Sequence, residues 1–323
     1  MITERIPSNM ILFLLKRKRF VFGVLFLVTM VTWSILNTVL HDGEIRQVLF
    51  FYDDKGNLID APPYPPFTVF LLGSDKFGYD LGQMMIEGAK YTIGITLIVA
   101  ILRLLLSLVA SSLIYSVSPK LFGFLKSLFE PFSVVPQTII VYFILFSVLW
   151  MPIDGFQTPF WKRALFETVI LIIIAIPNLT IHLANEMRIV EKEDFIVASK
   201  TLGANKRFIY FKHIVPHVYE KWILLFGQQF TQVLQLLAHL GFMKLFFGGT
   251  FVSYGMIVDD PRSVSYEWSG VIGGSLPYLY SSQWIIVVPV LFFIFTAISV
   301  ACINDSIKSY FQRKEYTFKR EKV

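Results

Sequence analysis

The sequence predicts an all-α membrane protein with six transmembrane helices. Apolar residues make up 55% of the 323 residues and charged residues only 16%, whereas soluble domains average about 45–50% apolar and about 25% charged residues. The mean hydropathy is +0.61. The 32 Phe and six Trp agree with this class, because apolar spans and membrane interfaces are both rich in aromatic residues.

Six stretches approach the ~20 apolar residues that a helix needs to cross about 30 Å of hydrocarbon. They cover residues 20–40, 90–117, 131–150, 164–184, 222–240 and 284–303. The first follows the basic run 16–19 and exceeds the ~7–15 apolar residues of a signal peptide, so we expect an uncleaved anchor. Pro136 and Pro177 can kink the third and fourth spans.

The basic residues predict that both termini lie on the cytoplasmic side. With this orientation, 20 of the 29 Lys and Arg lie in cytoplasmic segments and eight lie outside, as the positive-inside rule expects. The net charge of +6 then reflects topology and gives no reason to expect nucleic acid. The predicted segments are a cytoplasmic N-terminal segment (1–19), an anchor helix (20–40), an extracellular segment (41–89), a core (90–304) with a cytoplasmic loop (185–221), and a basic cytoplasmic tail (305–323).

The cytoplasmic loop contains a predicted two-helix elbow, which we define as residues 195–215. Gly203 suits a helix C-terminus that needs a positive φ, and Asn205 can cap the helix that follows. Pro216 is expected to stop that second helix. Residues at helical spacing form one face of each helix, namely Phe195, Ala198, Ser199 and Leu202 in the first and Phe208, Phe211 and Val215 in the second. Such an elbow cannot bury its apolar surface alone, and it needs the bilayer interface or a cytoplasmic partner.

Polar residues inside the spans are candidates for function because they are costly in hydrocarbon. One stripe of the fifth span carries Gln228, Gln232, Gln235 and His239. These residues either line a water-filled pathway or form hydrogen bonds between helices. Arg103 in the second span is either one half of a structural pair or a pathway residue. We find no paired catalytic groups, and the scattered histidines make a metal site improbable.

The stretch "VASKTLGANKRFIYFKHIVP" (197–216) resembles the EAA loop of ABC importer permeases. That pattern is Glu-Ala-Ala, three residues, Gly, nine residues, then Ile-x-Leu-Pro. The chain matches it at Ala198, Gly203 and Pro216. It departs from the pattern at Val197, Ser199, His213 and Val215.

Two further stretches resemble the C-type permease subunit of the oligopeptide, dipeptide and nickel branch of these importers. The first is "LLGSDKFGYDLGQMMIEGAKYTI" (71–93), in which Tyr79 and Gln83 replace the family's arginines. The second is "EWSGVIGGSLPYLYSSQWIIVVP" (267–289), followed by Asn304 and Asp305. The glycines and aspartates of the first stretch that match the family are Gly73, Asp75, Gly78, Asp80 and Gly88.

The resemblance implies a type I ABC importer permease in a bacterial inner membrane. It implies a second homologous permease, two cytoplasmic ATP-binding subunits that hold ATP and Mg, and an external substrate-binding lipoprotein, with a peptide as substrate. This chain would bind no cofactor and would carry no hydrolysis itself. The implied contacts with the ATPase come from Phe195, Ala198, Ser199, Leu202, Gly203, Phe208, Phe211, His213 and Pro216.

In the outer segment 41–89, "FFYDDKGNLID" (50–60) reads as a strand with a turn at residues 55–57, and "APPYPPF" (61–67) as a stiff, polyproline-like strut. It either contacts the binding protein or the second permease, or it only covers its own bundle.

Other functions are also compatible with the sequence. The chain could import nickel chelates or another small solute, or it could be a regulatory or sensory protein that keeps the permease scaffold. A secondary transporter ranks last because we see no clear internal repeats or broken-helix pair.

Overall fold

The computed structural model of the chain describes residues 10–52, 56–255 and 259–320. The helices are α1 (Met10–Leu15), α2 (Lys18–His41), α3 (Leu81–Ala89), α4 (Ile95–Ile114), α5 (Pro119–Phe129), α6 (Pro131–Val134), α7 (Gln137–Leu149), α8 (Phe160–Ile173), α9 (Ile176–Val190), α10 (Asp194–Thr201), α11 (Lys206–Ile209), α12 (Val215–Phe242), α13 (Trp268–Ser275) and α14 (Trp284–Arg320). Shorter turns are the π-helical η1 (Lys90–Gly94) and η2 (Tyr210–Ile214) and the 3-10 turn η3 (Leu276–Tyr278). The strands are β1 (Phe51–Tyr52), β2 (Leu58–Asp60), β3 (Thr250–Phe251) and β4 (Arg262–Ser263).

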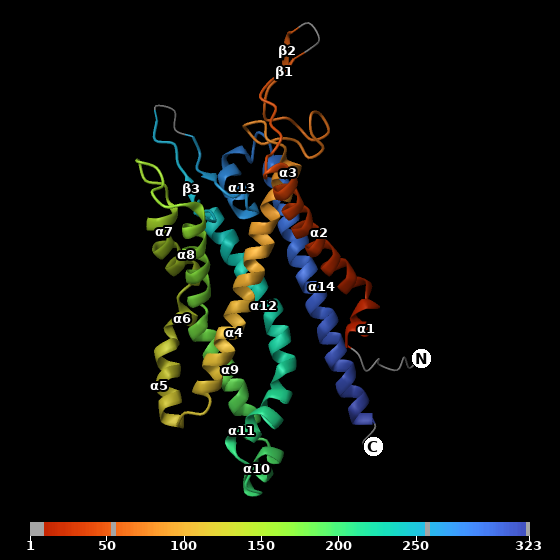
Figure 1. Ribbon diagram of the computed structural model, residues 1–323, viewed down its shortest axis with the longest axis vertical. Helices are drawn as coiled ribbons and strands as arrows, with labels where there is room; N and C mark the ends of the chain where they lie inside the picture. The colour runs from red at the N-terminus through yellow and green to blue at the C-terminus, as the bar shows by residue number, and fades with distance from the viewer. Residues whose placement is uncertain (1–9, 53–55, 256–258, 321–323) are drawn as a thin grey trace.

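The long helices run along an elongated bundle, with α10 and α11 at one end and the β1–β2 hairpin at the other (Figure 1). Four helical segments are long and apolar enough to cross a membrane, and there are five if the bent pair described below counts as one span. The four are Lys18–His41, Leu81–Ile114, Phe160–Val190 and Trp284–Lys314. Helices are therefore confirmed at the predicted spans 20–40, 90–117, 164–184 and 284–303.

The third predicted span, 131–150, is wrong as a single helix. The chain bends by 78° between two helical segments. The first consists of α5 and α6 and ends at Val134, and the second is α7. Pro136 causes the break, because its ring pushes the preceding Val135 out of the helical region, to φ −75° and ψ 127°. The 13 residues of α7 rise only about 20 Å at ~1.5 Å per residue, which is less than the hydrocarbon thickness.

The fifth predicted span, 222–240, lies inside α12. With 28 residues, α12 reaches about 42 Å and is long enough to cross a bilayer. It is not among the helices that are apolar enough by composition, since its glutamines and histidine lower its hydropathy. A sixth crossing at this helix therefore stays a prediction.

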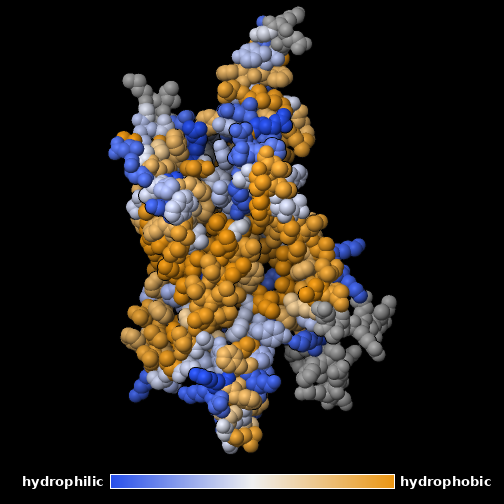
Figure 2. Space-filling model, viewed as in Figure 1, coloured by the Kyte–Doolittle hydropathy of each residue, from blue (hydrophilic) through white to orange (hydrophobic). Residues whose placement is uncertain are grey.

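The packing of the bundle leaves an apolar belt around it. α2 packs along α14, while α4 contacts α9 and α12, and α12 also contacts α13 and α14. Figure 2 shows apolar residues across the middle of the visible face and hydrophilic residues gathered toward both ends. Large apolar side chains such as Leu25, Leu105 and Ile294 are exposed. Because soluble proteins rarely expose so broad an apolar surface, this belt suits lipid.

Helices α12 and α13 approach each other through glycine. A Cβ atom on Gly273 would lie 1.9 Å from the carbonyl oxygen of Gly241, and one on Gly241 would lie 2.3 Å from that of Ser269. Only small residues permit two helix backbones to come this close, as is common in membrane bundles.

Trp268 joins the two outer stretches whose sequences resemble the permease family. Its side chain is fully buried, and its indole Nε1 donates a hydrogen bond to the carbonyl of Met85 at 2.9 Å. Its backbone N donates to Thr92 Oγ1 at 3.0 Å. Stretches 71–93 and 267–289 therefore form one structural unit, although they lie almost 200 residues apart.

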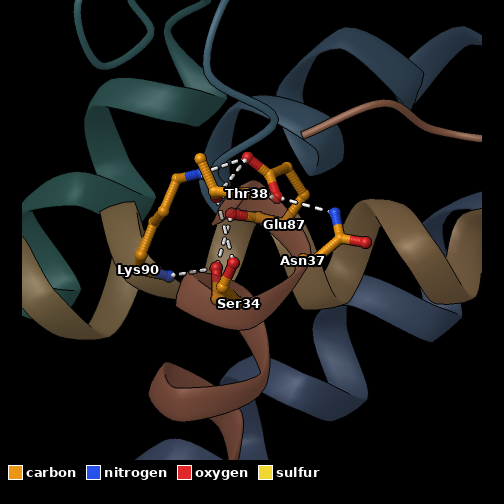
Figure 3. A network of polar contacts seen from close by, with 5 residues as sticks. All are labelled: Ser34, Asn37, Thr38, Glu87 and Lys90. Atoms are coloured by element: carbon orange, nitrogen blue, oxygen red, sulfur yellow. Dashed lines mark hydrogen bonds and ion pairs between the residues drawn. The ribbon is translucent and has the colours of Figure 1, made fainter. Parts of the chain in front are cut away.

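A polar network fastens α2 to α3 and η1 (Figure 3). Glu87 forms an ion pair with Lys90 and accepts a hydrogen bond from Asn37 Nδ2 at 2.9 Å. Ser34 Oγ donates to the carbonyl of Glu87 at 2.9 Å, and Thr38 Oγ1 contacts the Glu87 carboxylate. Every charged member has a partner, which is the condition under which buried charges are tolerated.

The outer segment contains the antiparallel pair β1–β2 where the sequence predicted a strand with a turn. Residue 55 of the predicted turn lies outside the described residues. The same is true of residues 1–9 in the N-terminal segment and 321–323 in the tail. The described part of the tail continues α14 as far as Arg320.

Candidate functional site

The elbow turns through the geometry that the sequence predicts at Gly203. Gly203 has φ +85°, and its N–H donates to the carbonyl of Lys200 at 3.0 Å. The N–H of Ala204 donates to the carbonyl of Ser199 at 3.1 Å. These two bonds are the pair that defines a Schellman motif. A Cβ atom on Gly203 would meet nothing within 4 Å, so the positive φ alone calls for glycine.

The second helix of the elbow begins as predicted but does not end as predicted. Asn205 caps α11, its side-chain oxygen accepting from the N–H of Phe208 at 2.7 Å. The chain then continues through η2 into α12 without a break. The expectation that Pro216 stops the helix is wrong. Pro216 lies in the first turn of α12, after a π-helical turn that changes the hydrogen-bond register, so its missing N–H is tolerated there.

Buried isoleucines fix the elbow to the ends of the long helices. Ile196 of α10, Ile209 of α11 and Ile214 of η2 are buried. They pack in one cluster with Tyr115, Phe122, Ala184, Met187 and Val218. The ring of Tyr210 also stacks on Tyr115, with centroids 5.4 Å apart.

One polar contact adds to this attachment, and another joins the helix ends that hold the elbow. Lys200 Nζ lies 2.8 Å from Glu191 Oε1, which ties α10 to the end of α9. Arg188 Nη2 donates to the carbonyl of Val117 at 2.6 Å, and its guanidinium lies 3.9 Å from the centroid of the Phe122 ring. The elbow is therefore held by the ends of α4, α5 and α9.

The face of α10 opposite Ile196 is exposed and apolar. Ala198 and Leu202 are exposed, the latter by 88%, and Phe195 is exposed in part, since its ring stacks on His217 of α12 with centroids 4.7 Å apart. On the second half of the elbow Phe208 and Phe211 are also exposed, the latter by 69%. The predicted surplus of apolar surface is thus present in the folded chain.

His213 links the two halves of the elbow. Its Nε2 lies 3.4 Å from Ser199 Oγ of α10. Its ring makes edge contacts with Phe195 and Phe208, at centroid distances of 6.0 and 5.5 Å. Ser199 and His213 therefore face each other between the two halves of the elbow, and the rings of Phe195 and Phe208 lie beside them.

The glutamine stripe of α12 faces outward from this chain. All four members, Gln228, Gln232, Gln235 and His239, are exposed, while the opposite side of α12 is buried. Gln232 Oε1 accepts a hydrogen bond from Gln229 Nε2 at 3.0 Å, and His239 Nδ1 lies 3.2 Å from Thr138 Oγ1. Of these two hydrogen bonds only the one of His239 joins α12 to another helix, α7, because Gln229 and Gln232 lie on the same helix.

Arg103 has a backbone partner that the sequence did not indicate. Its side chain is fully buried, and Nε donates to the carbonyl of Leu171 at 2.8 Å. The helix breaks between α8 and α9, where the N–H of Ala175 donates to the Ile172 carbonyl instead. The break thus frees the Leu171 carbonyl for Arg103, which supports a structural role.

The sequence patterns also missed two buried carboxylates, Glu167 and Glu267. Glu267 Oε1 accepts from the N–H of Phe247 at 3.1 Å, and Glu167 Oε2 accepts from the N–H of Gly248 at 3.0 Å. Both side chains are fully buried. Neither belongs to a periodic pattern, so their burial could not be deduced from spacing.

Comparison with known proteins places the elbow and the stripe within one family match. Residues 120–314 match the family described as binding-protein-dependent transport system inner membrane component. A peptide transport system permease protein of Haemophilus influenzae is 25% identical over 302 residues, which are 89% of this chain and 91% of that protein. A di/tripeptide transport system permease protein of Pseudomonas aeruginosa is 23% identical over 240 residues, 74% of this chain and 70% of that protein.

Proposed function

Because this chain belongs to the family of binding-protein-dependent transport system inner membrane components, we propose that it is the permease subunit of an ATP-driven ABC importer for dipeptides or oligopeptides. It is a multi-pass protein of the bacterial inner membrane. The substrate class follows the names of the two relatives. The observation that carries the mechanism is the elbow, a fixed two-helix turn with exposed apolar side chains at one end of the bundle.

The proposed topology has six crossings with both termini in the cytoplasm. α12 supplies the crossing that composition alone does not identify, and the bent α5–α7 segment supplies another. The excess of Lys and Arg in the segments at the elbow end supports this orientation. The elbow then lies in the cytoplasm and residues 41–89 lie outside.

In this orientation the elbow seats in a groove of a cytoplasmic ATPase subunit. Leu202 and Phe211 would lose their contact with water there, which is a favourable change of roughly 25 cal/mol for each Å² buried. The cluster around Ile196 and Ile209 would transmit the movement, because it attaches the elbow to the ends of α4, α5 and α9. Closure of the ATPases on ATP and Mg would therefore shift these helices together.

The glutamine stripe would line the pathway between this chain and a second, homologous permease. Outward-facing amides are costly against lipid, so a partner subunit or water must cover them. An uncharged amide can both donate and accept hydrogen bonds, which suits the peptide groups of a varied substrate. An external binding lipoprotein would deliver the peptide to the end of the bundle at which residues 41–89 lie.

The test is whether the purified assembly hydrolyses ATP in response to peptide. The chain would be tagged, purified from mild detergent and assayed with its binding protein, with and without a dipeptide. We expect ATPase subunits to co-purify and hydrolysis to rise with peptide. Hydrolysis that rises with a nickel chelate but not with a dipeptide would show that the substrate is a nickel chelate. A chain that purifies without any ATPase would instead support the regulatory or sensory alternative.

A further inference from the structure

A cavity of about 320 Å³ lies at the end of the molecule opposite the elbow. Residues 75–84 line one side, and residues 251–285 line the other. Its volume falls within the ~300–1,000 Å³ range of small-molecule sites. It is separate from the elbow, and none of the four residues of the glutamine stripe lines it.

The walls of the cavity are aromatic. The rings come from both sides of the cavity, and they belong to Phe77, Tyr79, Phe251, Tyr266 and Tyr278. Tyr79 and Tyr266 contact each other across the boundary, with centroids 6.5 Å apart. Such walls suit an apolar or aromatic group of a ligand.

Arg262 supplies a cation on the wall of the cavity. Its guanidinium carbon lies 4.3 Å from the centroid of the Phe77 ring and 5.4 Å from that of Phe251. In the part of the chain that the structure describes, no carboxylate lies within ion-pair distance of it. By contrast, Lys76 Nζ lies 3.7 Å from Asp260 Oδ2 and 3.9 Å from Asp259 Oδ1.

Asp75 supplies an anion on the same cavity. Its Oδ1 accepts from the N–H groups of Phe77 and Tyr79, at 2.9 and 2.8 Å. Burial raises the pKa of Asp75 to about 6, and the two backbone hydrogen bonds and the charges of Lys76 and Arg262 oppose that rise. The carboxyl is therefore mostly ionised at pH 7.

We propose that this cavity binds the C-terminal part of a short peptide, with Arg262 holding the terminal carboxylate and the aromatic walls holding the last side chain. A dipeptide also carries an ammonium group, for which Asp75 is the counter-charge. A guanidinium can donate two parallel hydrogen bonds to a carboxylate. Arg262 therefore determines that the C-terminal end of the peptide lies beside it. The inference rests on the proposed function for its choice of peptide, and it adds a receiving site in the permease itself.

The test measures binding of the dipeptide Ala-Phe to the full-length chain in lipid nanodiscs by calorimetry. We expect the Arg262→Gln variant to lose at least tenfold in affinity, and Ala-Phe amide to show the same loss on the unchanged chain. Ser275→Phe, which places a ring in the cavity, should also abolish binding. Arg46→Gln is the matched control, because Arg46 contacts Asp80 and Gln83 near the cavity but does not line it.

Absence of Ala-Phe binding to the unchanged chain would overturn the inference. Equal binding of Ala-Phe and its amide would do so too, and that comparison needs no variant to fold. If cells still take up peptide through the assembly in either case, the proposed function stands and only this site is lost. If no ATPase joins the chain, the proposed function fails on its own test.

Discussion

Leu202→Glu is expected to remove the ATPase subunits from the purified assembly while the chain itself stays in the membrane. Leu202 is 88% exposed, so the substitution should cost the isolated chain little. In the proposed groove, however, the new carboxylate would be buried without a partner, at a cost of several kcal/mol. A loss of about 3 kcal/mol already weakens binding roughly a hundredfold. The measurement is the amount of ATPase recovered per tagged chain.

Leu202→Met is the matched control, since it keeps an apolar side chain of similar volume. It should recover ATPase in wild-type amounts. Wild-type recovery by Leu202→Glu as well would show that the exposed face of the elbow does not meet the ATPase.

Gln232→Leu is expected to reduce peptide uptake about tenfold while the second permease and the ATPases still co-purify. Gln232 lies in the middle of the outward-facing stripe, and its loss would remove a donor and an acceptor from the proposed pathway. Each neutral hydrogen bond contributes roughly 0.5–1.5 kcal/mol, and about 1.4 kcal/mol corresponds to a factor of ten. Uptake of radiolabelled dipeptide into cells gives the rate.

Gln232→Asn keeps an amide at this position and should retain most of the uptake. If Gln232→Leu transports at the wild-type rate, the stripe does not line the pathway. Loss of the second permease from the Gln232→Leu preparation would instead assign the stripe to the subunit interface.

Local sequence rules predicted the elbow well because its geometry is local. The positive φ of Gly203 and the cap at Asn205 each depend on bonds within three to five residues. The same local rules gave a wrong prediction at Pro216. A proline stops a regular helix, but the π turn at 210–214 places Pro216 in the first turn of the next helix, and no residue type signals a π turn.

Long-range contacts explain what the sequence could not predict. Arg103 binds a carbonyl 68 residues away, which is available only because the helix breaks near Ala175. The cavity combines Asp75, which stands in a loop, with Arg262 of the two-residue strand β4, and neither residue belongs to a periodic pattern. Stretch 71–93 contains one wall of the cavity, but stretch 267–289 contains only part of the other wall and leaves out Arg262.

The measurement that tests the central claim most directly is affinity purification of the tagged chain with Gly203 unchanged, Gly203→Pro or Gly203→Asn. Proline fixes φ near −65° and removes the N–H that bonds to Lys200, whereas asparagine tolerates the positive φ at modest cost. We predict that Gly203→Pro keeps the second permease and loses the ATPases, and that Gly203→Asn keeps both. ATPases recovered equally with Gly203→Pro, or never recovered with the unchanged chain, would contradict the assignment of the elbow as the coupling element.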